Sequence, residues 1–286
     1  MSENSVSVHD RGARQTSLVY PVSSRRSGGL SIGINLFPDR KRCNFDCPYC
    51  EVRPFEGGAA YSAAVLAAEL EAFCKAGYAE GWSPEPVRDL CVSGNGEPTL
   101  SPHLAEALSL CAEARRAHPD LLGKAPIVVI TNGTGFLDAT TSRALAEFAK
   151  TEPLRIWAKL DGWDQDSFSA MSRSSFQLDD ILAALASFAC VTPITIQTML
   201  CGLGGRVPSL ADASVYAGRL ASLLAAGAKI EAVQLYTLAR MPSEANVSPL
   251  GDAALLAFAG EAAAALHGAV PVAAFGERGL GPLSAS

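Results

Sequence analysis

Residues 154–161 read Leu-Arg-Ile-Trp-Ala-Lys-Leu-Asp and alternate between two kinds of side chain. Successive side chains of a strand point to opposite faces, so this segment predicts a strand with two different faces. One face carries Leu154, Ile156, Ala158 and Leu160. The other carries Arg155, Trp157, Lys159 and Asp161. A strand between two layers of helices is usually apolar on both faces. The pattern therefore favours a barrel with helices outside and a polar interior.

Three further predicted strands divide in the same way. In the strand predicted near 30–36, the polar or small face carries Ser31, Gly33 and Asn35. In the strand near 192–200 it carries Thr195, Gln197, Met199 and Cys201, and in the strand near 230–238 it carries Gln234, Tyr236 and Arg240. The opposite faces are apolar enough to pack against helices. This arrangement indicates that a polar ligand occupies the inside of the barrel.

Strand-like and helix-like segments alternate along most of the chain. Strands are predicted near 30–36, 88–93, 126–131, 154–160, 192–200, 230–238 and, as a possible seventh, 269–275. Helices are predicted near 60–78, 102–118, 138–150, 176–189, 209–227 and 251–267. Such alternation implies parallel β/α units. We predict an α/β fold, a partial (β/α)6 TIM-like barrel with parallel strands; an open doubly wound sheet is the alternative.

No linker rich in Pro, Gly or Ser divides these units. We therefore predict a polar N-terminal arm over residues 1–28 and a single domain over 29–286. Hydrophobic residues make up 49% of the 286 residues and charged residues 18%, which is typical of a chain with a substantial core.

The charge and the N-terminus exclude some classes of protein. The net charge of −6 and the pI of about 5.3 argue against binding nucleic acid through a dominant basic surface. No apolar run reaches the roughly 18 residues of a membrane span. The polar N-terminus lacks the apolar region of a secretory signal. We expect a cytoplasmic protein without a membrane partner.

Three of the eight cysteines cluster in residues 43–50, Cys-Asn-Phe-Asp-Cys-Pro-Tyr-Cys. Cys43, Cys47 and Cys50 have C-x3-C-x2-C spacing. A structural zinc site needs a fourth ligand and usually takes cysteines in pairs. A redox C-x-x-C pair would use Cys47 and Cys50 but give Cys43 no role. Three thiolates on one short loop suit a [4Fe–4S] cluster that keeps one iron free for an external ligand.

This motif and several later segments resemble the radical S-adenosylmethionine (SAM) superfamily. CNFDCPYC matches the superfamily signature, including Tyr49 just before the last cysteine. The wider stretch 30–51 is similar to the opening of a subgroup that includes the tRNA wyosine-forming enzymes. Later segments are similar to that subgroup as well: SGNGEPTL at 93–100, ITNGT at 130–134, WAKLDG at 157–162 and VQLYTLAR at 233–240.

The resemblance implies a definite chemistry. Cys43, Cys47 and Cys50 would bind three irons, and the amino and carboxylate groups of SAM would chelate the fourth. An electron from a donor such as a flavodoxin or ferredoxin would cleave SAM to methionine and a 5′-deoxyadenosyl radical, which abstracts a substrate hydrogen. The protein would place the reacting atoms and exclude water.

The resemblance also implies binding residues for SAM. Asn95, Gly96 and Glu97 match the Gly-Gly-Glu-type motif that binds the SAM amino group in this superfamily, with Asn95 in place of the first glycine. Gly96 allows close approach of the backbone, and the Glu97 carboxylate can meet a cationic group. A turn with a solvated glutamate is the alternative interpretation of this segment.

Lys159 and Asp161 are predicted to point inward at the carboxyl end of their strand, where β/α barrels place ligand sites. We predict catalytic or SAM-binding roles for them; an ion pair without a ligand role is the alternative. Further candidates for the SAM pocket are Tyr49, Asn132, Gln197, Tyr236, Thr237 and Arg240.

Cys201 is predicted to end the fifth strand on the inward face, before the flexible Gly202. A thiol at that place can donate a hydrogen atom to a product radical. The alternative is a small residue that packs as a hydrophobic side chain.

The sequence leaves the substrate open among a small molecule, a peptide or protein, and tRNA. A local basic patch that favours tRNA would use Arg11, Arg14, Arg25, Arg26, Arg40, Lys41 and Arg42. The resemblance implies that the wyosine-type reaction uses extra cysteines for a second cluster. The absence of a second group of closely spaced cysteines therefore argues against this reaction, as does the acidic pI. A different class is a non-catalytic iron–sulfur or zinc protein. The polar inward faces argue against it.

Overall fold

The computed structural model describes residues 16–76 and 86–284. Its main sheet has eight strands in the order β1-β2-β3-β4-β5-β6-β8-β10, and all neighbours from β2 to β10 are parallel. The strands are β1 (Val19–Ser24), β2 (Gly29–Asn35), β3 (Val87–Gly94), β4 (Ile127–Thr131), β5 (Leu154–Lys159), β6 (Ile194–Met199), β8 (Ile230–Tyr236) and β10 (Val272–Phe275). A second, antiparallel pair consists of β7 (Cys201–Leu203) and β9 (Val247–Pro249).

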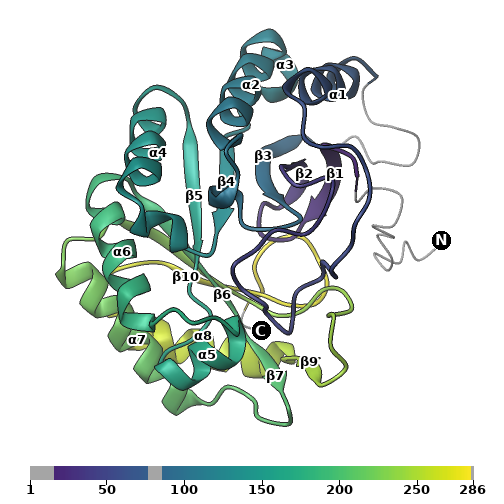
Figure 1. Ribbon diagram of the computed structural model, residues 1–286. Coiled ribbons are helices and arrows are strands. Elements are labelled where there is room, and N and C mark those ends of the chain that lie inside the picture. Colours follow the sequence, from purple (N-terminus) through teal and green to yellow (C-terminus); the bar gives the residue numbers. More distant parts are fainter. Residues whose placement is uncertain (1–15, 77–85, 285–286) are drawn as a thin grey trace.

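The strands follow one another across the sheet in chain order, and the sheet curls into a partial barrel with helices on its outside (Figure 1). A doubly wound sheet would reverse direction at a switch point. The helices are α1 (Ala63–Ala76), α2 (Leu104–Ala117), α3 (Pro119–Leu122), α4 (Ala139–Thr151), α5 (Gln165–Ser172), α6 (Leu178–Val191), α7 (Leu210–Ala225) and α8 (Asp252–Ala265). The predicted α/β partial TIM-like barrel is confirmed.

The outward faces of the strands form the core together with the helices. Ile156 on β5 and Ile196 on β6 belong to one continuous cluster with Leu185 of α6 and Leu220 of α7, and all four side chains are buried. The predicted division of β5 into two faces thus places its apolar side chains under the helices. Burial of this kind is the main stabilising term in such a fold.

Among the strands and α-helices of the described residues, five were not predicted from the sequence: β1, β7, β9, α3 and α5. The main sheet begins with β1 at Val19, ahead of the predicted domain boundary at residue 29. Residues 1–15 of the predicted arm, with Arg11 and Arg14, lie outside the described residues. The strand β1 is half-buried throughout and contains Pro21, so it lacks both the alternation and the continuous apolar run of a typical strand.

An antiparallel hairpin joins β1 to β2. The Tyr20 ring packs over Gly33, where a Cβ atom would lie 2.2 Å from a ring carbon. The small residue at this position therefore serves the packing of the hairpin. The turn of the hairpin carries Arg25 and Arg26, and their side chains reach Thr237 and Gln197 on the far side of the partial barrel.

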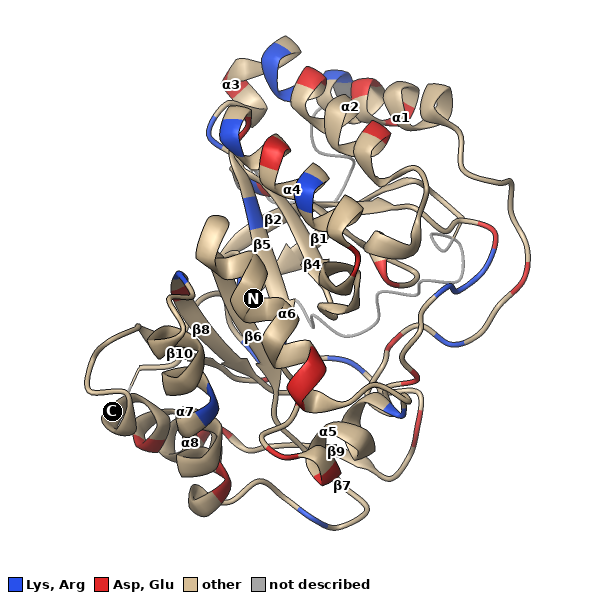
Figure 2. Cartoon of the chain, turned by 60° about the vertical axis from the view of Figure 1, so that its left-hand side comes forward, with Lys and Arg blue, Asp and Glu red and all other residues tan. Residues whose placement is uncertain are grey.

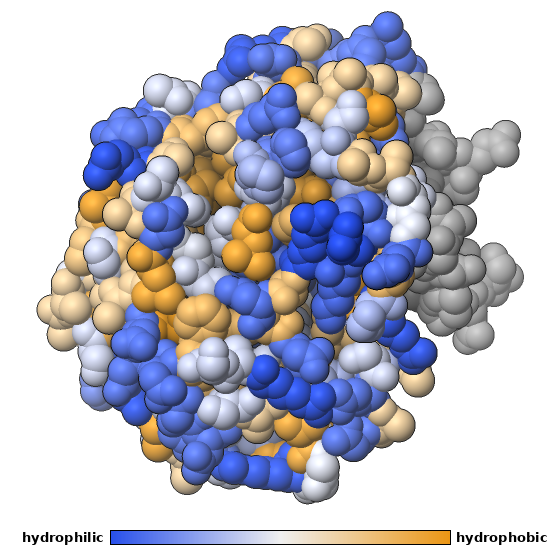
Figure 3. Space-filling model, in the orientation of Figure 1, coloured by the Kyte–Doolittle hydropathy of each residue, from blue (hydrophilic) through white to orange (hydrophobic). Residues whose placement is uncertain are grey.

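The surface carries charges of both signs along its helices and loops, without one broad face of a single sign in the view of Figure 2. The face shown in Figure 3 is largely hydrophilic, with apolar side chains exposed between the polar ones. Among the helices of the described ranges, none is long and apolar enough to cross a membrane.

Candidate active site

The segment between β2 and α1 carries the three cysteines and crosses the end of the barrel (Figure 1). On one side it pairs with the segment after β3. The Arg42 N–H donates to the Asn95 carbonyl over 3.0 Å, and the Glu97 N–H donates to the Arg42 carbonyl over 2.8 Å. A Cβ atom at Gly96 would lie 1.8 Å from the Arg42 carbonyl oxygen, so this position requires glycine. Two predicted site segments are therefore held together by their backbones.

The other end of the cysteine segment rests on the opposite side of the barrel. The Asp46 N–H donates to the carbonyl of Ser172 at the end of α5 over 2.8 Å. Ser243, in the loop before β9, donates its N–H to the Cys50 carbonyl over 3.1 Å and its hydroxyl to the Pro48 carbonyl over 3.2 Å. The loop is thus fixed at both ends over the carboxyl ends of the parallel strands.

The three cysteines are free thiols: Cys43 is exposed, and Cys47 and Cys50 are half-buried. Cys43 Sγ accepts the Phe45 N–H over 3.4 Å. Although Cys43 as a residue is exposed, desolvation of its thiol by neighbouring atoms raises its pKa to about 11, and burial raises the pKa of Cys47 to about 12. Both are therefore protonated thiols near neutral pH unless a metal displaces the proton.

Within residues 16–76 and 86–284, no three side chains of Cys, His, Asp or Glu converge as ligands of one metal ion would. Each thiolate of a four-iron cluster binds a different iron, so such ligands need not converge on one atom. Three thiols on a loop of eight residues fit this group, because they offer only sulfur ligands and leave the fourth position to another molecule.

Glu97 lies at the centre of a hydrogen-bond network at the ends of β3 and β4. Its buried carboxylate accepts the Thr99 N–H over 3.1 Å and the Thr99 hydroxyl, the Thr131 hydroxyl and the Asn132 N–H, each over 2.7 Å. Burial raises its pKa, although these four donors oppose the shift. The carboxylate thus joins two strand ends through neutral donors.

Asn132 connects β4 to the cysteine segment. Its amide donates to Asn44 Oδ1 over 2.8 Å, and its own Oδ1 accepts the Thr134 N–H over 3.0 Å and the Thr134 hydroxyl over 2.7 Å. Asn44 lies next to Cys43. The structure therefore places Asn132 beside the predicted cluster site, and the turn expected there is present, with Gly133 at φ 84°.

Lys159 and Asp161 form an ion pair at the carboxyl end of β5, with 2.9 Å between Nζ and Oδ2. The Tyr49 hydroxyl donates to the same Oδ2 over 2.5 Å, and the Met199 N–H donates to Oδ1 over 2.7 Å. Lys159 also donates to the Tyr236 hydroxyl, and its Nζ lies 5.0 Å from the centres of both tyrosine rings. Four predicted site residues from three distant segments thus meet in one cluster.

The surroundings of Lys159 and Tyr49 determine whether each side chain is charged. Burial by itself lowers the pKa of Lys159, but Asp161 and Tyr236 together outweigh burial and raise it. Burial raises the pKa of Tyr49 well above its ordinary value, and the Asp161 charge adds to the effect. The cluster therefore holds a lysine cation and neutral Tyr49 directly beneath the cysteine loop.

Gln197 lies in the interior of the barrel. It is fully buried, its amide donates to Gln234 Oε1 over 2.7 Å, and its Oε1 accepts Arg26 Nη1 over 2.8 Å. The Arg26 guanidinium also lies 4.3 Å from the centre of the Tyr236 ring. Contacts within the barrel interior thus occupy the polar atoms of Gln197.

Thr237 and Arg240 follow the end of β8. The Thr237 hydroxyl accepts the Leu250 N–H over 2.6 Å, and Arg240 forms an ion pair of 2.5 Å with Glu51, the neighbour of Cys50. Arg240 is therefore close to the cysteine loop.

Arg25, which the sequence suggests only as part of a basic patch, also reaches the interior of the barrel. It donates to the Thr237 carbonyl over 3.1 Å, while its Nη1 is buried without a hydrogen-bond partner in the described structure. Burial and the neighbouring Arg26 and Arg240 lower its pKa to about 10. The pair Arg25-Arg26 is visible in the sequence, but only the hairpin brings it inside the barrel.

Cys201 begins β7, whereas the sequence reading placed it at the end of the preceding strand, which stops at Met199. Its thiol is buried, and Sγ lies 4.0 Å from the sulfur of Met171. Burial raises its pKa to about 12. It belongs to a small apolar cluster that includes Tyr49 and Tyr236, so it borders the Lys159 site without a polar partner of its own in the described contacts beyond that sulfur.

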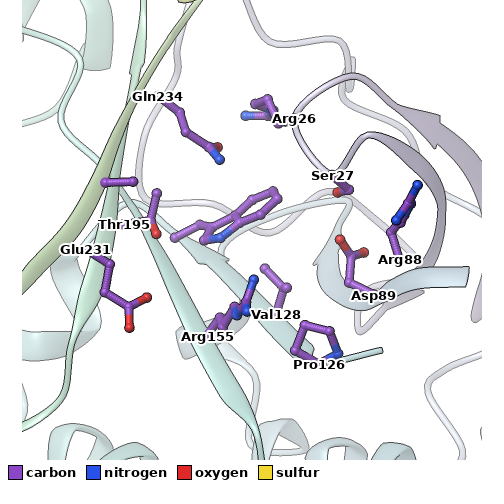
Figure 4. Close-up of a pocket in the computed structure, with 12 residues that line it drawn as sticks. Arg26, Ser27, Arg88, Asp89, Pro126, Val128, Arg155, Thr195, Glu231 and Gln234 are labelled. Carbon is purple, nitrogen blue, oxygen red and sulfur yellow. The ribbon is translucent and has the colours of Figure 1, made fainter. Parts of the chain in front are cut away.

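A cavity of about 410 Å³ lies at the opposite end of the strands, near their amino termini. Figure 4 shows the residues around it. It is lined by Arg26, Ser27, Arg88, Asp89, Pro126, Val128, Arg155, Trp157, Thr195, Glu231, Ala232 and Gln234. Arg26 contacts both this cavity and Tyr236, so it separates the cavity from the Lys159 site. The cavity is therefore distinct from the region around the cysteines.

No family model matches the chain. Among curated proteins, it is similar to UPF0026 proteins from two strains of Helicobacter pylori, with 29% identity over 170 residues and 30% over 174 residues. These matches cover 59% of this chain and 50% of each relative. A UPF0026 protein from Synechocystis is 29% identical over 189 residues, 63% of both chains. The chain spans about half the length of the first two relatives.

Two solved structures share the architecture. One is a radical SAM methyltransferase from Sphaerobacter thermophilus, with a TM-score of 0.54, 16% identity, and coverage of 92% of this chain and 78% of that one. The other is Streptococcus suis SuiB bound to S-adenosylmethionine, with a TM-score of 0.55, 15% identity, and coverage of 82% and 45%. The chain has their partial-barrel fold. At this identity the similarity establishes the fold alone.

Proposed function

We propose that this chain is a radical SAM enzyme. The observation that carries the proposal is the three-cysteine loop, which lies over the carboxyl ends of a partial barrel and is joined by its backbone to Asn95–Glu97. Ligand sites of β/α barrels lie at this end of the strands. Solved structures with the same fold, one of them with SAM bound, support the proposal.

Cys43, Cys47 and Cys50 would hold the [4Fe–4S] cluster and leave one iron to SAM. When bound, the cluster supplies an electron that cleaves SAM to methionine and a 5′-deoxyadenosyl radical, which takes hydrogen from the substrate. The Phe45 N–H donates to Cys43 Sγ, and hydrogen bonds to cluster sulfurs tune the reduction potential.

The backbone at Asn95 and Gly96 would receive the SAM amino group beside Cys43. Glu97 joins this backbone to the end of β4 through its hydrogen bonds with Thr131 and Asn132, so we assign it a positioning role. Asn132 positions the cysteine segment through Asn44.

Lys159 and Asp161 would form the floor of the site, and Tyr49 connects them to the loop. Tyr236 and Thr237 would line the same side. Arg240, together with the unpartnered Nη1 of Arg25, offers cationic donors for the SAM carboxylate or an anionic substrate group. Gln197 would contribute indirectly, because it accepts a hydrogen bond from Arg26, and Arg26 in turn packs against Tyr236.

Cys201 remains a candidate hydrogen-atom donor because it borders the cluster that contains Tyr49 and Tyr236. The variant Cys201→Ala distinguishes this role from packing. Loss of product with unchanged 5′-deoxyadenosine formation supports the donor role, and unchanged product formation removes it.

The similarity to the wyosine-forming subgroup makes tRNA modification a narrower form of the proposal. Part of the basic patch that this would need is already neutralised, because Asp39 pairs with Arg40 at 3.2 Å and with Arg42 at 2.7 Å. The structure therefore adds no support for tRNA over a small molecule or a peptide. A cytoplasmic location with a flavodoxin or ferredoxin as electron donor is part of the same proposal.

The decisive experiment is anaerobic reconstitution with iron and sulfide, followed by dithionite and SAM. We expect about four irons per chain, as the formula of the cluster requires, and 5′-deoxyadenosine as a product. Cys43→Ala should lose both, whereas Cys190→Ala, at an exposed cysteine on α6, should keep both. A well-formed cluster without SAM cleavage would indicate a non-catalytic iron–sulfur protein. Zinc in place of iron would contradict the proposal outright.

A further inference from the structure

The cavity at the amino ends of the strands has an unusual charge pattern. Three guanidinium groups border it, those of Arg26, Arg88 and Arg155, against the carboxyl groups of Asp89 and Glu231. Among the described residues, none of the three arginines forms an ion pair with a carboxylate. Like charges around one cavity repel one another, so this arrangement lowers stability unless an anion completes it.

The arginines surround the cavity. Figure 4 shows Arg26 on one side and Arg155 on the opposite side, with Arg88 beside Asp89 and Glu231 across from them. Arg26 is held by Gln197, and Arg88 donates its Nε to the Gly28 carbonyl over 3.0 Å. These contacts fix two of the guanidinium groups at the cavity, which reduces the entropy that a ligand must overcome.

The two carboxyl groups do not cancel this positive potential. Asp89 is buried and accepts the Ser31 hydroxyl, and burial raises its pKa despite that bond and the nearby arginines. Glu231 is exposed and reaches no arginine of the cavity within ion-pair distance in the described structure. The cavity therefore carries at least one excess positive charge.

One part of the remaining wall is apolar, beside the polar side chains of Ser27, Thr195 and Gln234. Trp157, Val128 and Pro126 line it, and Arg26 lies 5.9 Å from the centre of the Trp157 ring. A volume of about 410 Å³ suits a small organic molecule, since ligand sites begin at about this size. Guanidinium groups bind carboxylate and phosphate oxygens in a bidentate manner.

From these observations we infer that the amino-terminal cavity is a second binding site, for a small organic phosphate or carboxylate with an apolar body. The anionic group binds Arg155 and Arg88, and the apolar part contacts Trp157 and Val128. Residues at the amino ends of the strands of a β/α barrel ordinarily stabilise the fold and do not bind ligands. In the described part of the chain, three arginines without an ion-pair partner add electrostatic repulsion there.

The test measures binding of phenyl phosphate, benzoate and inorganic phosphate to the full chain by calorimetry, at constant ionic strength and without SAM. We expect saturable binding with one site, tighter for phenyl phosphate or benzoate than for inorganic phosphate, and weaker as sodium chloride is added. The better of the two organic anions identifies the anionic group. Because no SAM is present, this result is independent of the proposed enzymatic function.

Arg155→Gln and Arg88→Gln should each weaken binding at least tenfold, since each removes a charge-assisted contact. Both residues are exposed, and circular dichroism checks that the variants stay folded. Arg143→Gln, at an exposed arginine on α4 away from the cavity, should bind like the parent chain. Absence of saturable binding, or equal weakening in all three variants, would overturn the inference.

Discussion

The Tyr49 hydroxyl donates a hydrogen bond of 2.5 Å to Asp161 Oδ2, although 112 positions separate the two residues in the chain. Through this bond the cysteine-bearing loop is attached to the end of β5. The same oxygen also pairs with Lys159, so loop, strand and cation share one buried acceptor. Four predictions test how such contacts hold the site together.

Tyr49→Phe should lower the free energy of unfolding by about 1.5–3 kcal/mol, the range for a hydrogen bond to a charged group. Chemical denaturation measures this value. Tyr61→Phe is the matched control, because the buried Tyr61 hydroxyl has no hydrogen-bond partner in the described structure. It should leave stability unchanged or raise it slightly. If both variants lose the same free energy of unfolding, the hydrogen bond from Tyr49 to Asp161 does not stabilise the fold.

Gly96→Ala should prevent the cysteine segment from pairing with the strand end. The new methyl group would lie 1.8 Å from the Arg42 carbonyl oxygen, and backbone cannot move away as a flexible side chain can. We expect a large loss of stability, more than about 3 kcal/mol, and poor iron incorporation. Gly218→Ala on α7, where a Cβ atom meets nothing within 4 Å, should be neutral or stabilising by up to about 1 kcal/mol. A stable, iron-loaded Gly96→Ala protein would contradict the pairing.

Glu97→Gln should change how stability depends on pH. Because burial raises the pKa of Glu97 in the folded state above its ordinary value of 4.5, the folded chain binds more protons than the unfolded chain between these two values. The contribution of Glu97 is therefore fully present below pH 4.5 and is lost as pH rises through the raised pKa.

Urea denaturation between pH 4 and 8 checks this dependence. The stability of the parent chain relative to Glu97→Gln should fall as pH rises and then level off. Glu147→Gln, at an exposed glutamate on α4, corrects for the loss of one carboxylate. A difference that rises with pH would reverse the sign and refute the prediction.

Lys159→Met should leave Asp161 as a buried charge without its cation, at a cost of about 3–5 kcal/mol, reduced in proportion to the remaining exposure of the lysine side chain. The double variant with Asp161→Asn should be less destabilised than the sum of the two single variants. A double-mutant cycle by denaturation measures this coupling. Additive losses would mean that the two charges do not stabilise each other.

The sequence by itself determined the β/α pattern and most of its elements. Side chains of residues 154–160 alternate between two faces, and other strands repeat this division. That pattern was sufficient to predict the strands and the barrel, because side-chain alternation is a local property of extended backbone. The C-x3-C-x2-C motif and the inward Lys159 and Asp161 followed from spacing in the same way. The sequence did not reveal β1, since an edge strand with half-buried residues lacks both kinds of apolar pattern.

Only the tertiary structure decided which groups meet. It brought Tyr49, Lys159 and Tyr236 together from three segments, turned Glu97 toward the neutral donors of β4, and carried Arg25 and Arg26 into the barrel on a hairpin. Such contacts depend on register and strand order, which no local pattern encodes. The physical reason is that a buried polar group takes the partner that the surrounding packing leaves within hydrogen-bond distance, wherever that partner lies in the chain.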